Sequence, residues 1–442
     1  MSEIAAAYRP VTNRRVMKIA GPIVLSNATV PILGIVDTGV VGQLGEAAPI
    51  GAVGVGAVIL TAFYWLFGFL RMGTAGLASQ AHGRGDGAEV AALLVRVLMV
   101  AGTAGTAIIL LQLPLFAGAF LVSPASDEVE QLARGYISIR IWSAPAAIAI
   151  YGITGWLIAL ERTRAVLVIQ VWMNGLNILL DLWFVIGLDW GVNGVAIATF
   201  LAEWSGCIVG LWLCRDAFRG SAWRDWPRVF DRVRLKRMAQ VNTDILIRSV
   251  LLQAIFVSFL LFGADFGDVQ LASNQILLQF LQVTAFGLDG FAFAAETLVG
   301  QALGAGRRTE LRRAALLTSA WGLGIGVVLA LAFATIGPDL IDRMTTAPEV
   351  REVSRQYLYY MVAAPIIGVA AWMFDGIYIG ATRTRDMRNM MLVSTAAYFL
   401  AVYPLMWQFG NHGLWIGLLF SFVVRGATLA YRYPALEAEA EG

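Results

Sequence analysis

The sequence has few charged residues and almost no side chains suited to metal or redox chemistry. Asp, Glu, Lys and Arg make up 14% of the 442 residues, against about 25% in a soluble domain. There are two histidines and two cysteines, which excludes a Cys/His metal cage and a disulfide framework. No glycine-rich segment ends in Gly-Lys-Ser/Thr as a phosphate loop would, and no Ser/His pair suggests a catalytic site. We therefore expect neither an ATP site nor an enzyme.

Apolar residues account for 58% of the chain and recur in runs long enough to cross a hydrocarbon layer of about 30 Å as helices. The composition predicts an all-α membrane protein with twelve transmembrane helices. The first run has no cleavage site after it, so it is a membrane helix and not a signal peptide. The predicted spans are 19–41, 49–80, 91–120, 131–159, 165–187, 192–214, 239–263, 270–302, 313–336, 353–380, 388–409 and 413–431.

The loops between these spans alternate in charge. Arg and Lys dominate the N-terminus and the connections after the even-numbered spans, including the segment 215–238, whereas Asp and Glu dominate most of the others. Cytoplasmic loops retain Arg and Lys. We therefore expect both termini in the cytoplasm.

The two halves of the sequence repeat each other at an offset of about 221 residues. Ser79–Gly85 matches Gly300–Gly306, and Arg162–Arg164 matches Arg383–Arg385. The repeat predicts an N-terminal six-helix lobe (1–214), a basic cytoplasmic linker (215–238) and a C-terminal six-helix lobe (239–442). Two parallel repeats around a central cavity are typical of transporters in which one lobe rocks against the other.

Asp37 is the first of several ionisable residues that fall inside predicted spans, where a charge costs at least about 2.5–3.5 kcal/mol. A carboxyl withdrawn from water has a raised pKa and can exchange a proton near neutral pH. Pro22 and Pro31 precede it in the same span and permit a bend. The alternative is that Asp37 caps a helix end or bonds to nearby backbone.

Asn177 and Asp181 lie one helical turn apart in the fifth span and share a face. With Asp37 and the hydroxyl of Thr199 they can share a proton or hold a Na⁺ ion. Thr199 has an alternative, which is a hydrogen bond to its own helix backbone.

Four further acids, Glu203, Asp289, Glu296 and Asp375, are candidates for a substrate pathway that attracts cations. The alternative is a structural role. Glu203 follows Thr199 by one helical turn and can face the same interior. In a structural role, an acid of the second half would form an ion pair with Arg248. Arg71 either neutralises a cavity acid or reaches an interface.

These motifs together resemble the multidrug and toxic compound extrusion (MATE) family, and its DinF branch most closely. The resemblance covers essentially the whole chain and rests on Pro31–Gly45, Asn177–Asp181, Asp289–Gly304, Asp375–Met391 and Gly410–Trp415. It implies an inner-membrane antiporter of bacteria that exports organic, often cationic, compounds in exchange for H⁺ or Na⁺. The expected partners are these small molecules and the lipid bilayer, with no nucleic acid and no cofactor beyond the coupling ion, and we expect a monomer.

By this resemblance Asp37 is the coupling carboxylate, and Pro22 is the position about which the first helix bends. Asn177, Asp181 and Thr199 match the polar cluster of the N-terminal lobe, which Tyr136 joins from the fourth span. Thr154 stands where an asparagine is expected. The seventh span has no mid-membrane acid, so coupling is expected in the N-terminal lobe. The alternative function is a lipid-linked oligosaccharide flippase of the same superfamily, which would need basic residues in its cavity.

Overall fold

The computed structural model describes residues 9–42, 47–122 and 126–441, and all regular structure in these ranges is helical. The helices of the first half are α1 (Asn13–Gly42), α2 (Ala47–Trp65), α3 (Phe69–Gly83), α4 (Gly87–Leu110), α5 (Gln112–Val122), α6 (Asp127–Arg140), α7 (Ala144–Ala159), α8 (Thr163–Asp181), α9 (Gly191–Leu213) and α10 (Trp226–Val229). Those of the second half are α11 (Arg232–Ala264), α12 (Asp268–Gly304), α13 (Arg308–Met344), α14 (Pro348–Gly380), α15 (Thr384–Phe409) and α16 (Asn411–Ala438).

The helices confirm the predicted all-α membrane protein. Eleven segments of the described residues are long and apolar enough to span a membrane, and α1 coincides with the first predicted span. The third predicted span, 91–120, is divided at Leu111 between α4 and α5. Pro114 explains the break, because it has no backbone N–H to donate to the carbonyl of Leu110.

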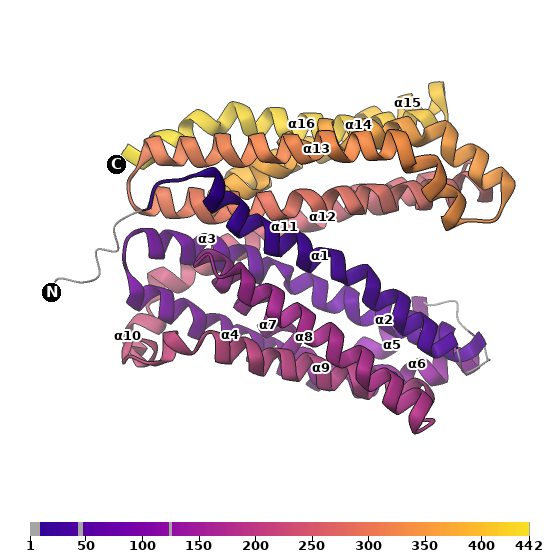
Figure 1. Cartoon of the computed structure of the whole chain (residues 1–442), viewed down its shortest axis with the longest axis horizontal. Coiled ribbons are helices and arrows are strands. Elements are labelled where there is room, and N and C mark those ends of the chain that lie inside the picture. Colours follow the sequence, from indigo (N-terminus) through magenta and orange to yellow (C-terminus); the bar gives the residue numbers. More distant parts are fainter. Residues whose placement is uncertain (1–8, 43–46, 123–125, 442) are drawn as a thin grey trace. The chain divides into compact units, whose positions relative to one another are not determined.

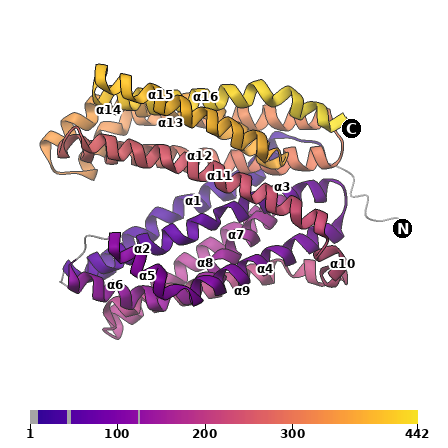
Figure 2. The same ribbon diagram turned by 180° about the vertical axis from the view of Figure 1, so that it is seen from behind.

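Packing divides the described chain into two compact units. Unit 1 comprises the residues up to Val24, Ser79–Gly85 and the chain from Lys236 onward, and unit 2 comprises Leu25–Ala78 and Asp86–Leu235. Within unit 1, α13, α14 and α16 lie side by side (Figures 1 and 2). The units thus group the start of α1 and the end of α3 with the second half, whereas the lobes predicted from the repeat run from 1 to 214 and from 239 to 442.

The internal repeat is visible in the backbone. Three pairs of residues with positive φ are each separated by 221 positions: Gly85 and Gly306, Glu161 and Thr382, and Asp189 and Gly410. Left-handed backbone is uncommon outside glycine. The recurrence of positive φ at one offset therefore shows that the backbone turns at corresponding positions in the two halves.

The repeated Ser79–Gly85 and Gly300–Gly306 segments cross one another within unit 1. A Cβ atom at Gly83 would lie 2.1 Å from the carbonyl oxygen of Gln301, and one at Gly304 would lie 2.1 Å from that of Gln80. Only glycine permits this approach. The matching glycines of the motif are thus required by a crossing of α3 and α12.

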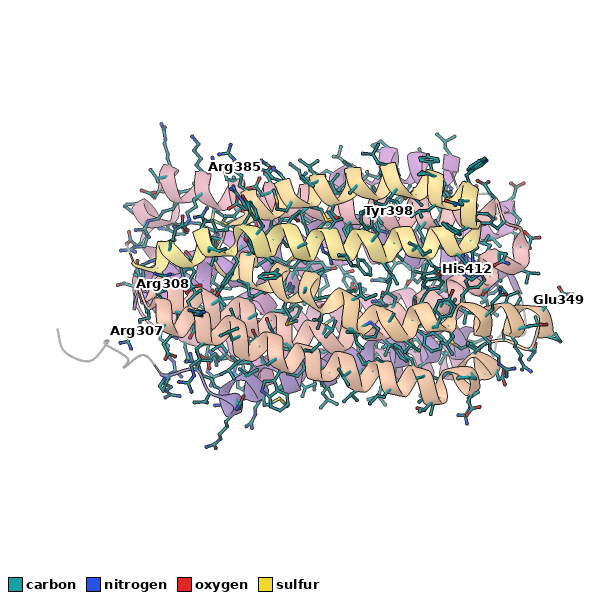
Figure 3. The ribbon with its side chains drawn as sticks, turned by 90° about the horizontal axis from the view of Figure 1, so that it is seen from above. Arg307, Arg308, Glu349, Arg385, Tyr398 and His412 are labelled. Carbon is teal, nitrogen blue, oxygen red and sulfur yellow. The ribbon has the colours of Figure 1, made fainter. Side chains whose placement is uncertain are left out.

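Charge is segregated along the helices of unit 1. Arg307, Arg308 and Arg385 lie at one end of the helices, and Glu349 and His412 lie at the other (Figure 3). The loops at the two ends of unit 1 therefore differ in charge as the sequence predicts.

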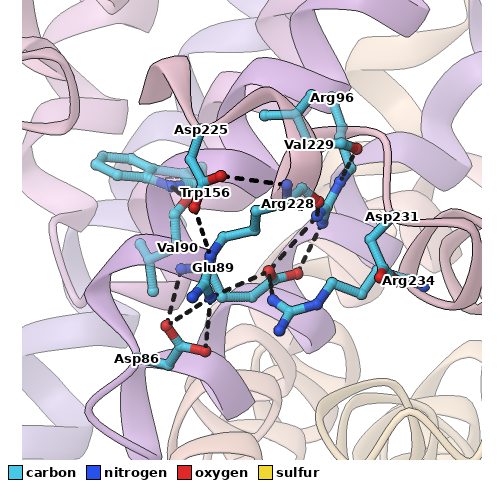
Figure 4. Close-up of polar contacts among 10 residues, drawn as sticks. All are labelled: Asp86, Glu89, Val90, Arg96, Trp156, Asp225, Arg228, Val229, Asp231 and Arg234. Carbon is cyan, nitrogen blue, oxygen red and sulfur yellow. Dashed lines mark hydrogen bonds and ion pairs between the residues drawn. The ribbon is translucent and has the colours of Figure 1, made fainter. Parts of the chain in front are cut away.

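The predicted basic linker is folded onto the start of α4 in unit 2 (Figure 4). The buried Arg96 side chain donates to the carbonyl oxygens of Arg228 (2.6 Å) and Val229 (2.8 Å). It also pairs with Glu89 at 2.7 Å, and Glu89 pairs in turn with Arg234. The segment that connects the two halves is therefore held by the buried guanidinium of Arg96 together with ion pairs such as that between Arg228 and Asp86 at 3.1 Å.

Replacing Arg96 by Met is expected to release this segment, because the change removes the donor for two backbone carbonyls and leaves Glu89 with one fewer partner. Each unmet bond costs about 1–3 kcal/mol. Hydrogen–deuterium exchange of the purified protein is expected to accelerate across residues 222–231. Arg134→Met removes an exposed pair with Glu130 and is the control. Equal exchange in the two variants would show that Arg96 does not hold the linker.

Candidate cation-coupling site

The face of α8 that the sequence singles out carries four polar side chains in unit 2. Gln170 donates to Asn174 at 3.1 Å, and Asn177 donates to a carboxylate oxygen of Asp181 at 2.5 Å. Asn177 and Asp181 are almost fully buried. The structure thus brings the predicted pair together. It adds Gln170 and Asn174, and their spacing in the sequence already places them on the same face of the helix.

Asp181 is the last α-helical residue before a change in backbone geometry. The six residues Leu182–Gly187 that follow it form a π-helix. Wider turns of this kind are rare and occur frequently at functional sites. The carboxylate therefore lies at a junction where the helix departs from regular hydrogen bonding.

The first helix contacts this face of α8 through a hydroxyl. Asn174 donates to Thr29 Oγ1 of α1 at 3.0 Å. The first and fifth spans of an alternating bundle run in the same direction. Asp37 lies about 12 Å beyond Thr29 along α1, and Asp181 lies about 10.5 Å beyond Asn174 along α8, at 1.5 Å per residue. The two positions are thus at nearly the same level.

The side chain of Asp37 lies outside the described residues, although its backbone belongs to α1. Its contacts, and the Na⁺ site that includes it, stay predictions. Pro22 and Pro31 also lie within α1. The chain passes from unit 1 to unit 2 just after Pro22, between Val24 and Leu25, which is where a hinge would act.

Tyr136 and Glu203 meet at a buried arginine that the sequence interpretation missed. Arg140 donates to the Tyr136 hydroxyl at 2.9 Å and pairs with Glu203 at 2.6 Å, between α6 and α9. Ser143 donates to the second oxygen of Glu203, and Tyr64 donates to the Arg140 carbonyl at 3.2 Å. Arg140 follows Tyr136 by one helical turn, and this spacing in the sequence could have indicated that the two side chains meet.

Two threonines of unit 2 bond to their own helices. Thr199 Oγ1 donates to the carbonyl oxygen of Val195 at 3.0 Å, the alternative that the sequence left open. Thr154, at the position where an asparagine is expected, donates to the carbonyl oxygen of Ile150 at 2.8 Å. Each hydroxyl oxygen keeps a lone pair with which it can still accept or ligate.

Asp375 of unit 1 forms ion pairs with two buried arginines. Arg248 of α11 is bonded to it directly, and Arg425 of α16 lies 3.9 Å away. This is the ion pair that the sequence proposed as the alternative to a substrate role, with Arg425 added. One carboxylate between two guanidinium groups leaves this cluster with a positive charge.

Two other acids of the predicted substrate pathway lie on α12. Glu296 is 1% exposed, and Asp289 is half-buried. Their separation of seven positions places both on similar faces of the helix, as the sequence predicts. Their contribution to a substrate pathway stays a prediction.

The motif near the C-terminus has a structural role in unit 1. Asn411 and Asn274 exchange two amide hydrogen bonds of 2.7 and 3.0 Å, and Trp415 donates to Asn274 at 2.9 Å. All three residues are buried. The Gly410–Trp415 motif thus joins α16 to α12.

A family model described as MatE matches residues 22–183 and again residues 245–407. DNA damage-inducible protein F of Escherichia coli is 36% identical over 439 residues, covering 97% of this chain and 93% of that protein. A probable multidrug resistance protein NorM of Rhodopseudomonas palustris is 27% identical over 442 residues, covering 96% of this chain and 91% of that protein.

Solved structures with the same fold include the Vibrio cholerae MATE transporter VcmN in the bent form. The two chains share 18% identity, and the match covers 97% of each with a TM-score of 0.85. At this identity the likeness shows the fold. The two separate matches of the family model agree with the repeat of 221 residues in the backbone.

Proposed function

Because the chain belongs to the MatE family of multidrug efflux transporters, we propose that it is a secondary active antiporter of the bacterial inner membrane. It exports organic, often cationic, compounds in exchange for H⁺ or Na⁺. Its substrates are small molecules taken from the cell or the bilayer, and it uses no cofactor other than the coupling ion. It acts as a monomer with both termini in the cytoplasm, and it binds no nucleic acid.

The single observation that carries this proposal is the buried Asn177–Asp181 pair on α8, with α1 docked beside it through Thr29. A carboxylate held away from water is costly in its charged form and readily takes up a proton. A change of charge there alters the contacts that hold α1. The pair therefore supports coupling in unit 2.

The proposed cycle links the ion to the substrate through α1. In the outward-facing state Asp37 takes up a proton, the polar contacts of Asp37 and Asp181 rearrange, α1 bends near Pro22 and Pro31, and the substrate site is lost. In the inward-facing state the proton leaves and substrate binds again. Ion and substrate thus favour different states, which is the differential binding that coupling requires.

H⁺ is our preferred coupling ion. On this face of α8 Asp181 supplies the single carboxylate, and Asn177 donates to it. A proton needs a single carboxylate, whereas a Na⁺ ion needs several oxygen ligands directed at one point. The single carboxylate on this face of α8 therefore favours H⁺ as the coupling ion.

Purified protein in liposomes tests the proposal by ethidium efflux with either an imposed pH gradient or an imposed Na⁺ gradient. We expect a pH gradient alone to drive ethidium against its concentration gradient. Efflux driven by a Na⁺ gradient alone would identify Na⁺ as the coupling ion and would leave the antiporter proposal standing. If neither gradient moves a range of organic cations, the antiporter proposal fails.

The flippase alternative is favoured by one observation, the surplus of positive charge where Arg248 and Arg425 meet Asp375. Basic groups bind the pyrophosphate of a lipid-linked sugar. Transfer of such a lipid between leaflets of the same liposomes, without dependence on either ion gradient, would support the flippase in place of the antiporter.

A further inference from the structure

A large polar cavity opens at the basic end of unit 1, outside the coupling site. Its volume is about 1310 Å³, and its walls come from the end of α3, the start of α11, the turn between α14 and α15, and the end of α16. Arg385 on its wall lies at the same end of the helices as Arg307 and Arg308 (Figure 3). By the charge pattern of the loops this end faces the cytoplasm.

The acidic residues of the cavity wall are already neutralised. Asp244 pairs with Arg388 at 2.6 Å, and Asp386 pairs with Arg383 at 3.1 Å and with Arg432 at 3.0 Å. The third acid, Glu439, also pairs with Arg383. The three carboxylates thus balance three of the seven basic side chains in the wall.

The other basic side chains leave the cavity positive. Arg84, Lys236 and Arg385 are exposed on its wall and form no ion pair with any described residue. Arg237 is held in place by the amide oxygen of Gln80 at 2.9 Å and the hydroxyl of Thr382 at 3.1 Å. Arg84, Lys236 and Arg385 therefore give this one space three cations that no acid of the described residues balances.

The backbone adds to this potential. Helix α15 begins in the wall of the cavity at Thr384, and no side chain caps its N-terminus. The first N–H groups of a helix carry partial positive charge and bind anions well. Arginine forks and a helix N-terminus together form the donor set that phosphate oxygens prefer.

The corresponding place in the first half of the repeat is built differently. Arg162, the counterpart of Arg383, lies 3.5 Å from Asp216 of the linker in unit 2. The linker thus supplies an acid to the counterpart turn. Arg383 has its own acidic partners, Asp386 and Glu439, so the two turns differ in which segment supplies the acid.

We propose that this cavity binds a phosphate-bearing anion, either the headgroup of an anionic phospholipid of the cytoplasmic leaflet or a soluble phosphate compound. Its size accommodates a headgroup, and clusters of Arg and Lys at the cytoplasmic ends of membrane helices attract anionic lipids. The site does not depend on what the transporter exports. Its ligand is a regulator or a structural lipid, separate from the exported compound.

Binding of short-chain phosphatidylglycerol to the purified full-length protein in neutral detergent tests the proposal. The variant Arg84→Gln/Lys236→Gln/Arg385→Gln removes the three cations without ion pairs. We expect its affinity to fall at least about tenfold, since each basic group near an anionic headgroup contributes measurably. The control Arg14→Gln/Arg312→Gln/Arg313→Gln removes equal charge from unit 1 outside the cavity and is expected to bind as the wild type does.

Competition identifies the source of the phosphate. If inorganic phosphate or ATP displaces the short-chain lipid at comparable concentration, the ligand is a soluble phosphate compound; if neither does, it is the lipid headgroup. A short-chain phosphatidylcholine is expected to bind poorly in either case. Equal losses in the two triple variants, or no binding by the wild type, would overturn the proposal. A monodisperse elution profile verifies that each variant is folded.

Discussion

Asp37→Asn is expected to abolish concentrative efflux while leaving expression and folding intact. Asparagine has nearly the shape of aspartate but takes up no proton, so the cycle loses the step that makes substrate release depend on the ion gradient. Ethidium efflux from liposomes under an imposed pH gradient measures the effect. Exchange of ethidium at equal concentrations on the two sides is expected to be weakened as well, because asparagine resembles the protonated carboxyl, the form in which the proposed cycle loses the substrate site.

Two further variants, one expected to be inactive and one expected to be active, are compared with Asp37→Asn. Asp181→Asn is expected to be similarly inactive, because it removes the carboxylate that Asn177 contacts on α8. Asp127→Asn changes an exposed acid in the first turn of α6 and is expected to transport normally. Full efflux by Asp37→Asn would contradict coupling through this carboxylate and would move the search to the acids of unit 1.

Breaking the ion pair between Arg140 and Glu203 is expected to have the largest effect on stability. Both side chains are largely buried, with 10% and 13% of their surfaces exposed. Removing one partner of a buried pair costs about 3–5 kcal/mol, whereas replacing both by apolar groups of similar volume is often neutral. Arg140→Met is therefore expected to lower the thermal midpoint of the purified protein strongly, and Arg140→Met/Glu203→Leu is expected to recover most of the loss.

The exposed pair of Arg134 and Glu130 on the same helix α6 is the matched control. A pair of that kind contributes about 0.3–0.5 kcal/mol, so Arg134→Met is expected to melt close to the wild type. The double variant also separates stability from transport. A double variant that is stable but inactive would assign the Arg140–Glu203 pair to the transport cycle. Equal melting of Arg140→Met and Arg134→Met would contradict the structural role of the pair.

Features that depend on local sequence were predictable. Spans follow from apolar runs, and the Asn177–Asp181 pair follows from helical spacing of four residues. The repeat follows from matching residues, such as Ser79–Gly85 and Gly300–Gly306, and positive φ recurs at Gly85 and Gly306 in the structure. The division of the third span at Leu111 was also available in principle, since Pro114 is visible in the sequence.

Contacts between distant segments were not predictable from one sequence. Arg96 and Val229 are 133 positions apart, and Arg425 and Asp375 lie on different helices. An arginine inside an apolar run is equally compatible with a buried pair and with an interfacial position. The partners are fixed only when the helices pack. The cavity of unit 1 is of the same kind, since its basic residues come from four separate parts of the chain.

Proton release on substrate binding tests the central claim, that ion and substrate compete through the carboxylates of unit 2. Ethidium is titrated into the purified protein in weakly buffered detergent solution, and bound dye and released protons are followed together. We expect wild-type protein to release protons as ethidium binds and to bind it more tightly as pH rises, and we expect Asp37→Asn to do neither. Ethidium binding by the wild type with constant affinity across pH and no proton release would contradict the account.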